Sequence, residues 1–241
     1  MALLICEQGP LWSALTAALL RDGKSVATAR PQERDLFSAA SGKQTILYAP
    51  AASLLAGTLD PRPSRERMAE VLRAAKAPGV QAVVLLVPLG GGFEEEETLL
   101  RHSGKPFVVL RSPPLLDEVA AQVGTSDHEA LWVPRAGVAE VTDGERLVAA
   151  VLAAIDGDQQ GSSRRVAGDI LDAPTLFGRA VNLFAPSGAP PKLQVHGVWP
   201  PLYRITRRVL KLLGRPEPAA LPLWDKLGQS VLAPAHELVA A

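Results

Sequence analysis

Short apolar runs alternate with amphipathic stretches over the first two-thirds of the chain. The apolar runs predict strands over Ala2–Cys6, Ser25–Ala29, Thr45–Tyr48, Ala82–Val87, Pro106–Leu110 and Ala130–Val133. The stretches between and after them predict helices over Leu11–Asp22, Gln32–Ala40, Ser64–Ala77, Glu94–His102, Leu115–Val123 and around Leu147, Val151 and Ile155. Such alternation predicts a parallel sheet with helices on its faces.

The last third of the chain follows a different pattern. From Asp156 the periodicity weakens, with Gly/Ser-rich and Pro-rich segments at 157–163 and 185–191, before a helical pattern returns over Leu202–Leu213. We therefore expect one compact unit made of a main α/β domain over residues 1–156 and a small C-terminal helical lobe over residues 157–241 packed on it.

Composition narrows the class of protein. The 25 Lys and Arg residues balance 25 Asp and Glu residues, so no global field would attract nucleic acid or an anionic membrane. A single cysteine excludes an intramolecular disulfide and a cysteine-based zinc cluster. The sequence also lacks the pattern of a secretory signal and an apolar stretch of the ~18 residues that a membrane helix needs. These features predict a cytoplasmic protein.

The first strand, turn and helix are typical of the mononucleotide-binding unit of a Rossmann fold. That unit normally has three glycines, for the tight turn, the approach to a pyrophosphate and the packing of helix on strand. Only the middle glycine is present, at Gly9, while Cys6 and Trp12 stand at the other two positions. We assign Gly9, Pro10, Leu11 and Trp12 to a candidate cofactor turn. The Trp12 side chain either blocks the pyrophosphate groove or lies clear of it.

Four segments carry a resemblance to a known group of proteins. They are Leu4–Arg30, Ala74–Val87, Leu99–Arg111 and Val138–Ile155. In these the chain resembles the atypical or extended short-chain dehydrogenase/reductases, among them the NmrA-like and NAD-dependent epimerase/dehydratase-like proteins. The resemblance covers roughly the first two-thirds of the chain, and its most specific part is the helix, Ser-Gly turn and strand that ends in Leu110-Arg111.

The resemblance implies a doubly wound parallel sheet that binds NADP or NAD. Arg30 ends the second strand, where an arginine can pair with the 2′-phosphate of NADP; it can equally be an exposed residue without a role. Ala49 and Pro50 directly follow the strand at Thr45–Tyr48 and complete the candidate cofactor site. The connection before that strand is about half as long as in those families, which predicts a sheet short of one edge strand.

The catalytic residues of the family are missing. Its reaction uses a tyrosine as general acid/base, a lysine four residues later and a serine that orients the substrate. Tyr48 and Tyr203 are followed four residues later by Ala52 and Arg207, and no serine lies between residues 81 and 102. We therefore assign no catalytic residue.

Other candidate sites have weaker support. The glycines at 90–92 could hold a phosphate, but the acids at 94–97 favour a plain loop that enters a helix with a positive N-terminal end. Cys6 has apolar neighbours that suppress thiol reactivity. Asp127-His128-Glu129 has the residue types of a metal site without a spacing that would bring them together, and we expect no metal.

The predicted tail helix has two faces. Leu202, Ile205, Val209 and Leu212 form an apolar stripe opposite Arg204, Arg207, Arg208 and Lys211. Such a helix can lie on an anionic membrane or contact an acidic partner, whereas packing of the stripe on the small lobe is the simpler interpretation.

Two main hypotheses about function follow. In the first, the chain is a non-catalytic protein, similar to the NmrA-like regulators, that binds a dinucleotide weakly or not at all and contacts a protein partner or another copy of itself. In the second, it is an active NAD(P)H-dependent reductase or epimerase/dehydratase-like enzyme that recruits His102, His128 or Tyr203 as acid/base. A third possibility is a structural member of an assembly, for which a groove filled by Trp12 would be evidence. A large apolar crevice with one convergent titratable group beside the Leu110-Arg111-Ser112 strand end would favour the enzyme.

Overall fold

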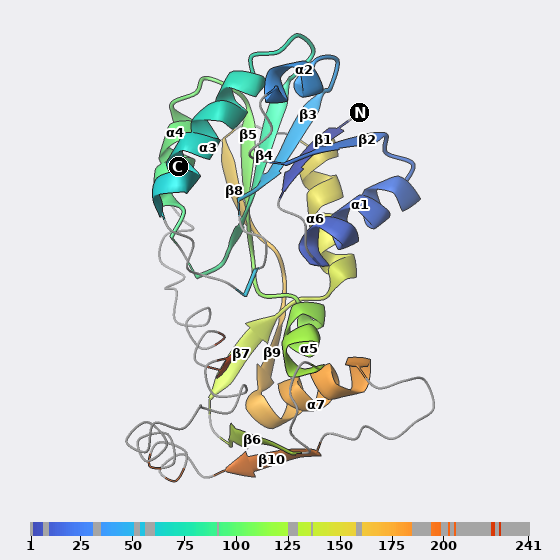
Figure 1. Ribbon diagram of the computed structural model, residues 1–241, viewed down its shortest axis with the longest axis vertical. Coiled ribbons are helices and arrows are strands. Elements are labelled where there is room, and N and C mark those ends of the chain that lie inside the picture. Colours follow the sequence, from blue (N-terminus) through green and yellow to red (C-terminus); the bar gives the residue numbers. More distant parts are fainter. Residues whose placement is uncertain are drawn as a thin grey trace.

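The main body of the molecule is a twisted parallel sheet between two layers of helices (Figure 1). The computed structural model describes residues 2–6, 10–30, 35–50, 54–55, 61–90, 92–124, 130–135, 137–157, 161–184 and 194–198, with residues 202, 205, 223, 224 and 227. In these residues the sheet has six strands in the order β2-β1-β3-β4-β5-β8, all of them parallel.

The six strands are short and mostly apolar, and the central ones are buried along their whole length. Their bounds are Ala2–Cys6 (β1), Val26–Ala29 (β2), Thr45–Ala49 (β3), Ala82–Pro88 (β4), Phe107–Ser112 (β5) and Ser162–Arg165 (β8). Every residue of β3 and of β4 is buried, as expected of parallel strands that are covered on both faces.

Helices cover both faces of this sheet (Figure 1). One face packs against α1 (Pro10–Arg21) and α6 (Gly144–Asp156), and the other against α2 (Leu36–Ala40), α3 (Pro61–Ala74) and α4 (Glu94–Arg101). The buried stripe of α1 is made of Leu11, Leu15 and Leu19, at the spacing that places residues on one side of a helix. The predicted doubly wound α/β fold is confirmed.

The sequence predicts that the sheet lacks one edge strand, and the edge formed by β2 bears on this prediction. β1 pairs with β2 on one side and β3 on the other, and only the short α2 lies between β2 and β3 in the described part of the chain. No described strand pairs with the outer edge of β2, so the predicted loss of one edge strand is confirmed for these residues.

The remaining elements pack into a second unit below the carboxyl ends of the strands (Figure 1). They are α5 (Leu116–Gly124), β6 (Ala130–Pro134), β7 (Val138–Val141), β9 (Asp169–Asp172), α7 (Ala173–Phe184) and β10 (Gln194–Val198). Their apolar residues, among them Val119, Leu131 and Phe177, form a core cluster of their own that also includes Leu227. β6 pairs with β10, and β7 pairs antiparallel with β9.

Each of the two units contains segments from before and from after residue 156. β8 comes after that residue and joins the main sheet, whereas α5, β6 and β7 come before it and belong to the lower unit. The division of the chain into 1–156 and 157–241 stays a prediction.

Of the predicted tail helix, only positions 202 and 205 lie in the described residues. Leu202 and Ile205 are 53% and 56% exposed, so at these two positions the apolar stripe is not packed on the small lobe. No helix among the described residues has the length and apolar character needed to cross a membrane.

Candidate functional site

The carboxyl ends of β1, β2 and β3 meet at one edge of the sheet, because the strands are parallel and in register. Ile5 pairs with Ala29, and Cys6 pairs with Ala49. Arg30 and Pro50 each follow the last residue of a strand, so the structure brings both to this edge. Ligands of open α/β sheets bind outside the carboxyl ends of the strands.

The start of α1 lies at the same edge, since β1 ends at Cys6 and α1 begins at Pro10. Leu11 is fully buried and packs with the α1–α6 side of the core. Trp12 is partly buried and contacts the same cluster. Gly9 lies outside the described residues. The start of α1 combines free backbone N–H groups with a positive dipole end, which is a general site for anions such as a pyrophosphate.

The other candidate cofactor residues differ in exposure. Ala49 is fully buried and Pro50 is buried, so they can only back the site as an apolar wall beneath its surface, whereas Arg30 is exposed and can reach a ligand outside the sheet. The edge along β1, β2 and β3 thus provides a helix N-terminus, an apolar wall and a cation. No contact in the structure tests whether these seven candidate residues bind a cofactor, and their role remains a prediction.

Among the described residues, none presents an exposed hydroxyl group at the carboxyl ends of β4 and β5. Leu89, just after β4, is 8% exposed and its N–H donates to the Ser112 carbonyl at 2.8 Å. Ser112 is fully buried, and its hydroxyl donates to the Pro113 carbonyl at 2.9 Å. A serine is therefore present at the end of β5, but its proton is already bonded to the backbone.

A buried ion pair lies beside the same strand end. Arg111 Nη2 is 2.6 Å from Glu97 Oε1, and the side chains are 22% and 7% exposed. Burial raises the pKa of the Glu97 carboxyl, and the charge of Arg111 opposes that change only in part. This is a titratable group at the position that the sequence analysis associated with an active enzyme.

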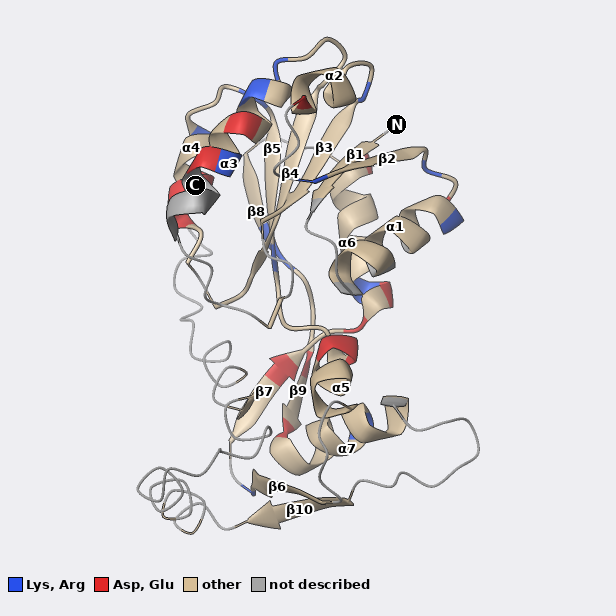
Figure 2. Cartoon of the chain, viewed as in Figure 1, with Lys and Arg blue, Asp and Glu red and all other residues tan. Residues whose placement is uncertain are grey.

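A second ion pair lies next to the first. Arg165 on β8 pairs with Glu140 on β7, whose side chain is 7% exposed. Arg111 and Arg165 are register partners, so they stand side by side on the same face of the sheet. Each has its own carboxylate partner, and the four charges balance. Figure 2 shows the charged segments at the ends of β5 and β8.

In the glycine loop before α4, the amide of Gly92 is already bonded to a carboxylate and so is closed to an anion. Gly92 N donates to Glu94 Oε1 at 3.0 Å, and this bond, with a further one from Glu94's own amide, lowers the pKa of the Glu94 carboxyl. The sequence interpretation, a loop that leads into a helix with acids at its N-terminus, agrees with this arrangement.

Of the three residues considered as substitutes for the missing tyrosine, only His102 lies in the described part of the chain. Tyr48 is fully buried within β3, and His102 lies at the end of α4, where its Nδ1 is 2.7 Å from the Thr98 carbonyl oxygen. His128 and Tyr203 lie outside the described residues. Among the residues that the structure describes, no three His, Cys, Asp or Glu side chains gather as metal ligands.

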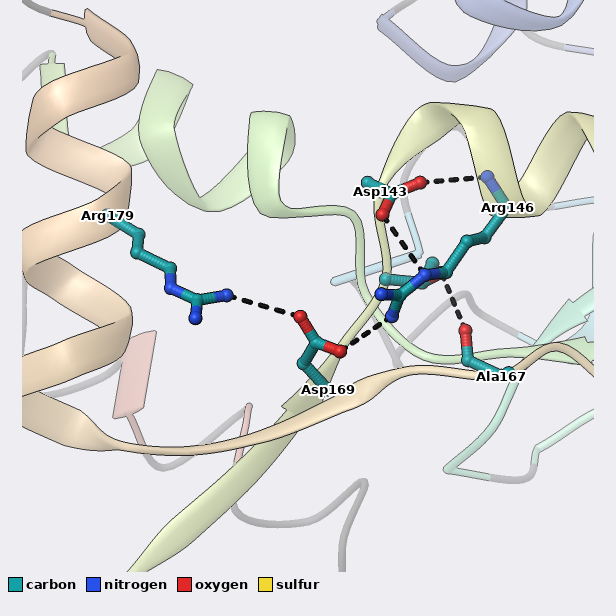
Figure 3. A network of polar contacts seen from close by, with 6 residues as sticks. Asp143, Arg146, Ala167, Asp169 and Arg179 are labelled. Atoms are coloured by element: carbon teal, nitrogen blue, oxygen red, sulfur yellow. Dashed lines mark hydrogen bonds and ion pairs between the residues drawn. The ribbon is translucent and has the colours of Figure 1, made fainter.

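Below the strand ends, an exposed polar network joins the two units (Figure 3). Asp169 on β9 receives hydrogen bonds from Arg146 on α6 at 2.7 Å and from Arg179 on α7 at 3.2 Å. Arg146 also pairs with Asp143, the residue that caps α6. These contacts lower the pKa of the Asp169 carboxyl, chiefly through the bond from Arg146.

One buried carboxylate at this junction was missed by the sequence analysis. Glu118, in the first turn of α5, is 3% exposed and accepts hydrogen bonds from the Leu54 amide at 3.0 and 3.1 Å. It also accepts one from the Leu115 amide at 3.4 Å. The available signal was weak: an acid directly before the buried Val119, on a helix whose inward face is otherwise apolar.

No protein-family model and no curated protein sequence matches this chain. Its fold is nevertheless similar to that of several solved structures. A nucleoside-diphosphate-sugar epimerase from Staphylococcus aureus has a TM-score of 0.65 at 15% identity, over 97% of this chain and 91% of that one. Triphenylmethane reductase from Citrobacter sp., solved with NADP(H), has a TM-score of 0.65 at 14% identity, over 98% and 92%.

A dTDP-glucose 4,6-dehydratase from Streptomyces venezuelae, solved with NAD, has a TM-score of 0.58 at 14% identity, over 82% of this chain and 84% of that one. At such identities the likeness establishes the fold. It is the fold of the epimerase-like and reductase-like proteins that the sequence resembles, and the expectation drawn from the four sequence segments is confirmed at that level.

Proposed function

We propose that this chain binds a nicotinamide dinucleotide along the carboxyl ends of β1, β2 and β3, and that it acts as a non-catalytic regulatory or interaction protein. The pyrophosphate would lie at the start of α1, and Arg30 would favour the 2′-phosphate of NADP(H) over NAD(H). The partner would be another protein or a second copy of the chain. Structures with bound NADP(H) and NAD among those of similar fold support the choice of ligand.

The observation that carries the non-catalytic part is the chemistry at the end of β4. Hydride transfer to or from a carbonyl needs a group that moves a proton at the reacting oxygen. Here the strand ends at Pro88 and is followed by Leu89, both buried, and the nearby Ser112 donates to the backbone. No tyrosine in the whole sequence has a lysine four residues later.

The proposal is tested by titrating NADPH, NADP⁺, NADH and NAD⁺ into the purified protein. Tryptophan fluorescence reports contact near Trp12, and the melting temperature rises with any ligand that binds only the native state. We expect saturation at micromolar NADPH, weaker binding of NADH, and no oxidation of bound NADPH by added carbonyl compounds. No response at millimolar concentrations of all four would refute dinucleotide binding.

One observation favours a second candidate, an NAD(P)H-dependent reductase or epimerase-like enzyme. The carboxyl group of Glu97 has a raised pKa and lies beside the end of β5. A raised pKa at such a position is typical of a general acid. This candidate predicts that NADPH is consumed with a suitable carbonyl substrate and that Glu97→Gln abolishes consumption while NADPH still binds. Turnover that survives in Glu97→Gln would remove Glu97 from the mechanism.

A further inference from the structure

The Glu118 carboxylate bonds to the chain that follows β3. Both of its oxygens lie within 3.1 Å of the Leu54 amide nitrogen, and the Leu115 amide nitrogen is 3.4 Å from one of them. A carboxylate that is 3% exposed loses most of its hydration, so backbone N–H donors are needed to offset that cost. This pairing therefore links α5 to the segment after β3 by charge-assisted hydrogen bonds.

Leu54 and Leu55 lie where the two apolar cores meet. Leu54 belongs to the cluster between the sheet and α1, whereas Leu55 belongs to the cluster of the lower unit. Two neighbouring side chains are thus buried in different cores, and the amide of the first is bonded to Glu118. This arrangement fixes the backbone at a short distance along the chain from Ala49 and Pro50.

The segment that carries Glu118 is itself held from two sides. Leu116 N donates to the Thr142 carbonyl and Thr142 N donates to the Pro114 carbonyl, each at 2.9 Å. The start of α5 is therefore attached to the residue that follows β7. Glu118 therefore projects from a turn of helix that is bonded to the lower unit, while its carboxylate bonds to Leu54.

We propose that Glu118 is a positioning residue for dinucleotide binding: by holding Leu54 it keeps the end of β3, with Ala49 and Pro50, in the place where these residues form the wall of the site. This inference rests on the dinucleotide-binding function proposed above. A buried wall that shifts by a fraction of an ångström displaces the groups packed on it that contact the ligand, and ordering a segment on binding lowers the affinity.

The test compares Glu118→Gln with a matched control. Glutamine keeps the volume and one acceptor oxygen, but it removes the negative charge and replaces the second acceptor by an NH₂ group, so the charge-assisted hydrogen bonding to the Leu54 N–H is weakened. The control is Glu140→Gln, which changes another buried glutamate, 5% exposed, that pairs with Arg165 and has no bond to the β3 segment. We expect both variants to melt at lower temperature, and only Glu118→Gln to raise the NADPH dissociation constant, by about tenfold.

Amide hydrogen exchange at Leu54 provides a readout that a general loss of stability does not mimic. In the wild type, NADPH should slow exchange at Leu54, and in Glu118→Gln this amide should exchange faster while the central strand β4 stays protected. If Glu118→Gln does not fold, Glu118→Asp, which shortens the side chain by one methylene group and keeps the charge, replaces it in both measurements.

The outcomes separate the two proposals. Wild-type protein that binds none of the four dinucleotides refutes the proposed function and this inference with it. Wild-type protein that binds NADPH, with Glu118→Gln binding equally well, refutes only the role of Glu118. Equal weakening of NADPH binding in Glu118→Gln and Glu140→Gln would also overturn that role, because it would reduce the effect to lost stability.

Discussion

The carboxyl edge of the sheet has two halves that differ in chemistry. Along β1, β2 and β3 it offers a helix N-terminus, an apolar wall and the exposed Arg30. Along β4, β5 and β8 it holds two ion pairs, Glu97–Arg111 and Glu140–Arg165, and a serine bonded to the backbone. The first half keeps groups that can recognise a dinucleotide, whereas the charges of the second half bind one another.

This difference shows why fold and activity have to be argued separately. The same sheet order and the same two helix layers support both halves, yet the described residues of the two halves differ in their polar groups and in how these are paired. A self-neutralised set of buried charges fixes geometry and leaves little free charge for chemistry.

The largest effect on stability is expected from removing one partner of an ion pair in the half along β4, β5 and β8. Glu97→Ala leaves Arg111, only 22% exposed, without its carboxylate, and removal of one partner of a buried pair usually costs about 3–5 kcal/mol. Because Arg111 retains some solvent contact, we expect a loss of about 2–3 kcal/mol in the free energy of unfolding, measured by urea denaturation. A change in the free energy of unfolding below about 0.5 kcal/mol would mean that the Glu97–Arg111 pair contributes little to stability.

The next effect concerns the other half of the edge. Arg30→Ala should raise the NADPH dissociation constant about tenfold, equivalent to about 1.4 kcal/mol, and leave NADH binding nearly unchanged. The control is Arg21→Ala, which removes an exposed arginine at the end of α1, away from the strand ends. Equal losses for NADPH and NADH, or a matching loss in the control, would contradict a role in phosphate recognition.

A pH dependence distinguishes the two halves further. The pKa of Glu97 is raised above 4.5 in the folded protein, so the native state binds this proton more tightly than the unfolded chain does. The stability contributed by Glu97 is therefore present below about pH 4.5 and is lost as the pH rises through the raised pKa. Relative to Glu97→Gln, the wild type should lose free energy of unfolding as the pH increases.

Urea titrations of wild type and Glu97→Gln at several values from about pH 4 to pH 8 check this slope. If the wild type instead gains stability over the variant as the pH rises, the attraction of Arg111 exceeds the cost of burying the carboxylate, and the pKa of Glu97 is lowered.

The smallest effect is expected from the exposed network that joins the two units. Asp169→Asn weakens the bonds to Arg146 and Arg179, but all three side chains are 41–50% exposed. Exposed pairs contribute little, and salt screens them. We expect a small drop in melting temperature at low salt that disappears at about 1 M salt. A large drop that persists in salt would assign this network a greater role in joining the units.

Much of the fold could be predicted because the signals are local. The buried strands β1, β3 and β4 are continuous apolar runs, and α1 and α6 repeat leucine or valine at helical spacing. The missed strand β8 reads Ser-Ser-Arg-Arg, which has no apolar pattern, and its pairing with β5 comes from the tertiary structure. In α7 the helical signal is weakened by Pro174 and Gly178, although its inward face is apolar.

The candidate site could be predicted only in part, for a similar reason. The position of Arg30 and Pro50 at the edge of the sheet could be predicted because they follow predicted strands, whereas their role in a site stays a prediction. The pairs formed by Glu97 with Arg111, by Glu140 with Arg165 and by Glu118 with Leu54 join residues far apart in the chain. Only the strand order and the packing of α4 and α5 bring them together, and neither can be obtained from residue types and spacing.

The most direct test of this account is a crystal structure of the protein with saturating NADPH. The account predicts a pyrophosphate at the start of α1, the 2′-phosphate beside Arg30, and unchanged ion pairs at Glu97 and Glu140. NADPH bound elsewhere, or a nicotinamide ring in contact with Glu97 or Arg111, would contradict the division of the edge into a binding half and a self-neutralised half.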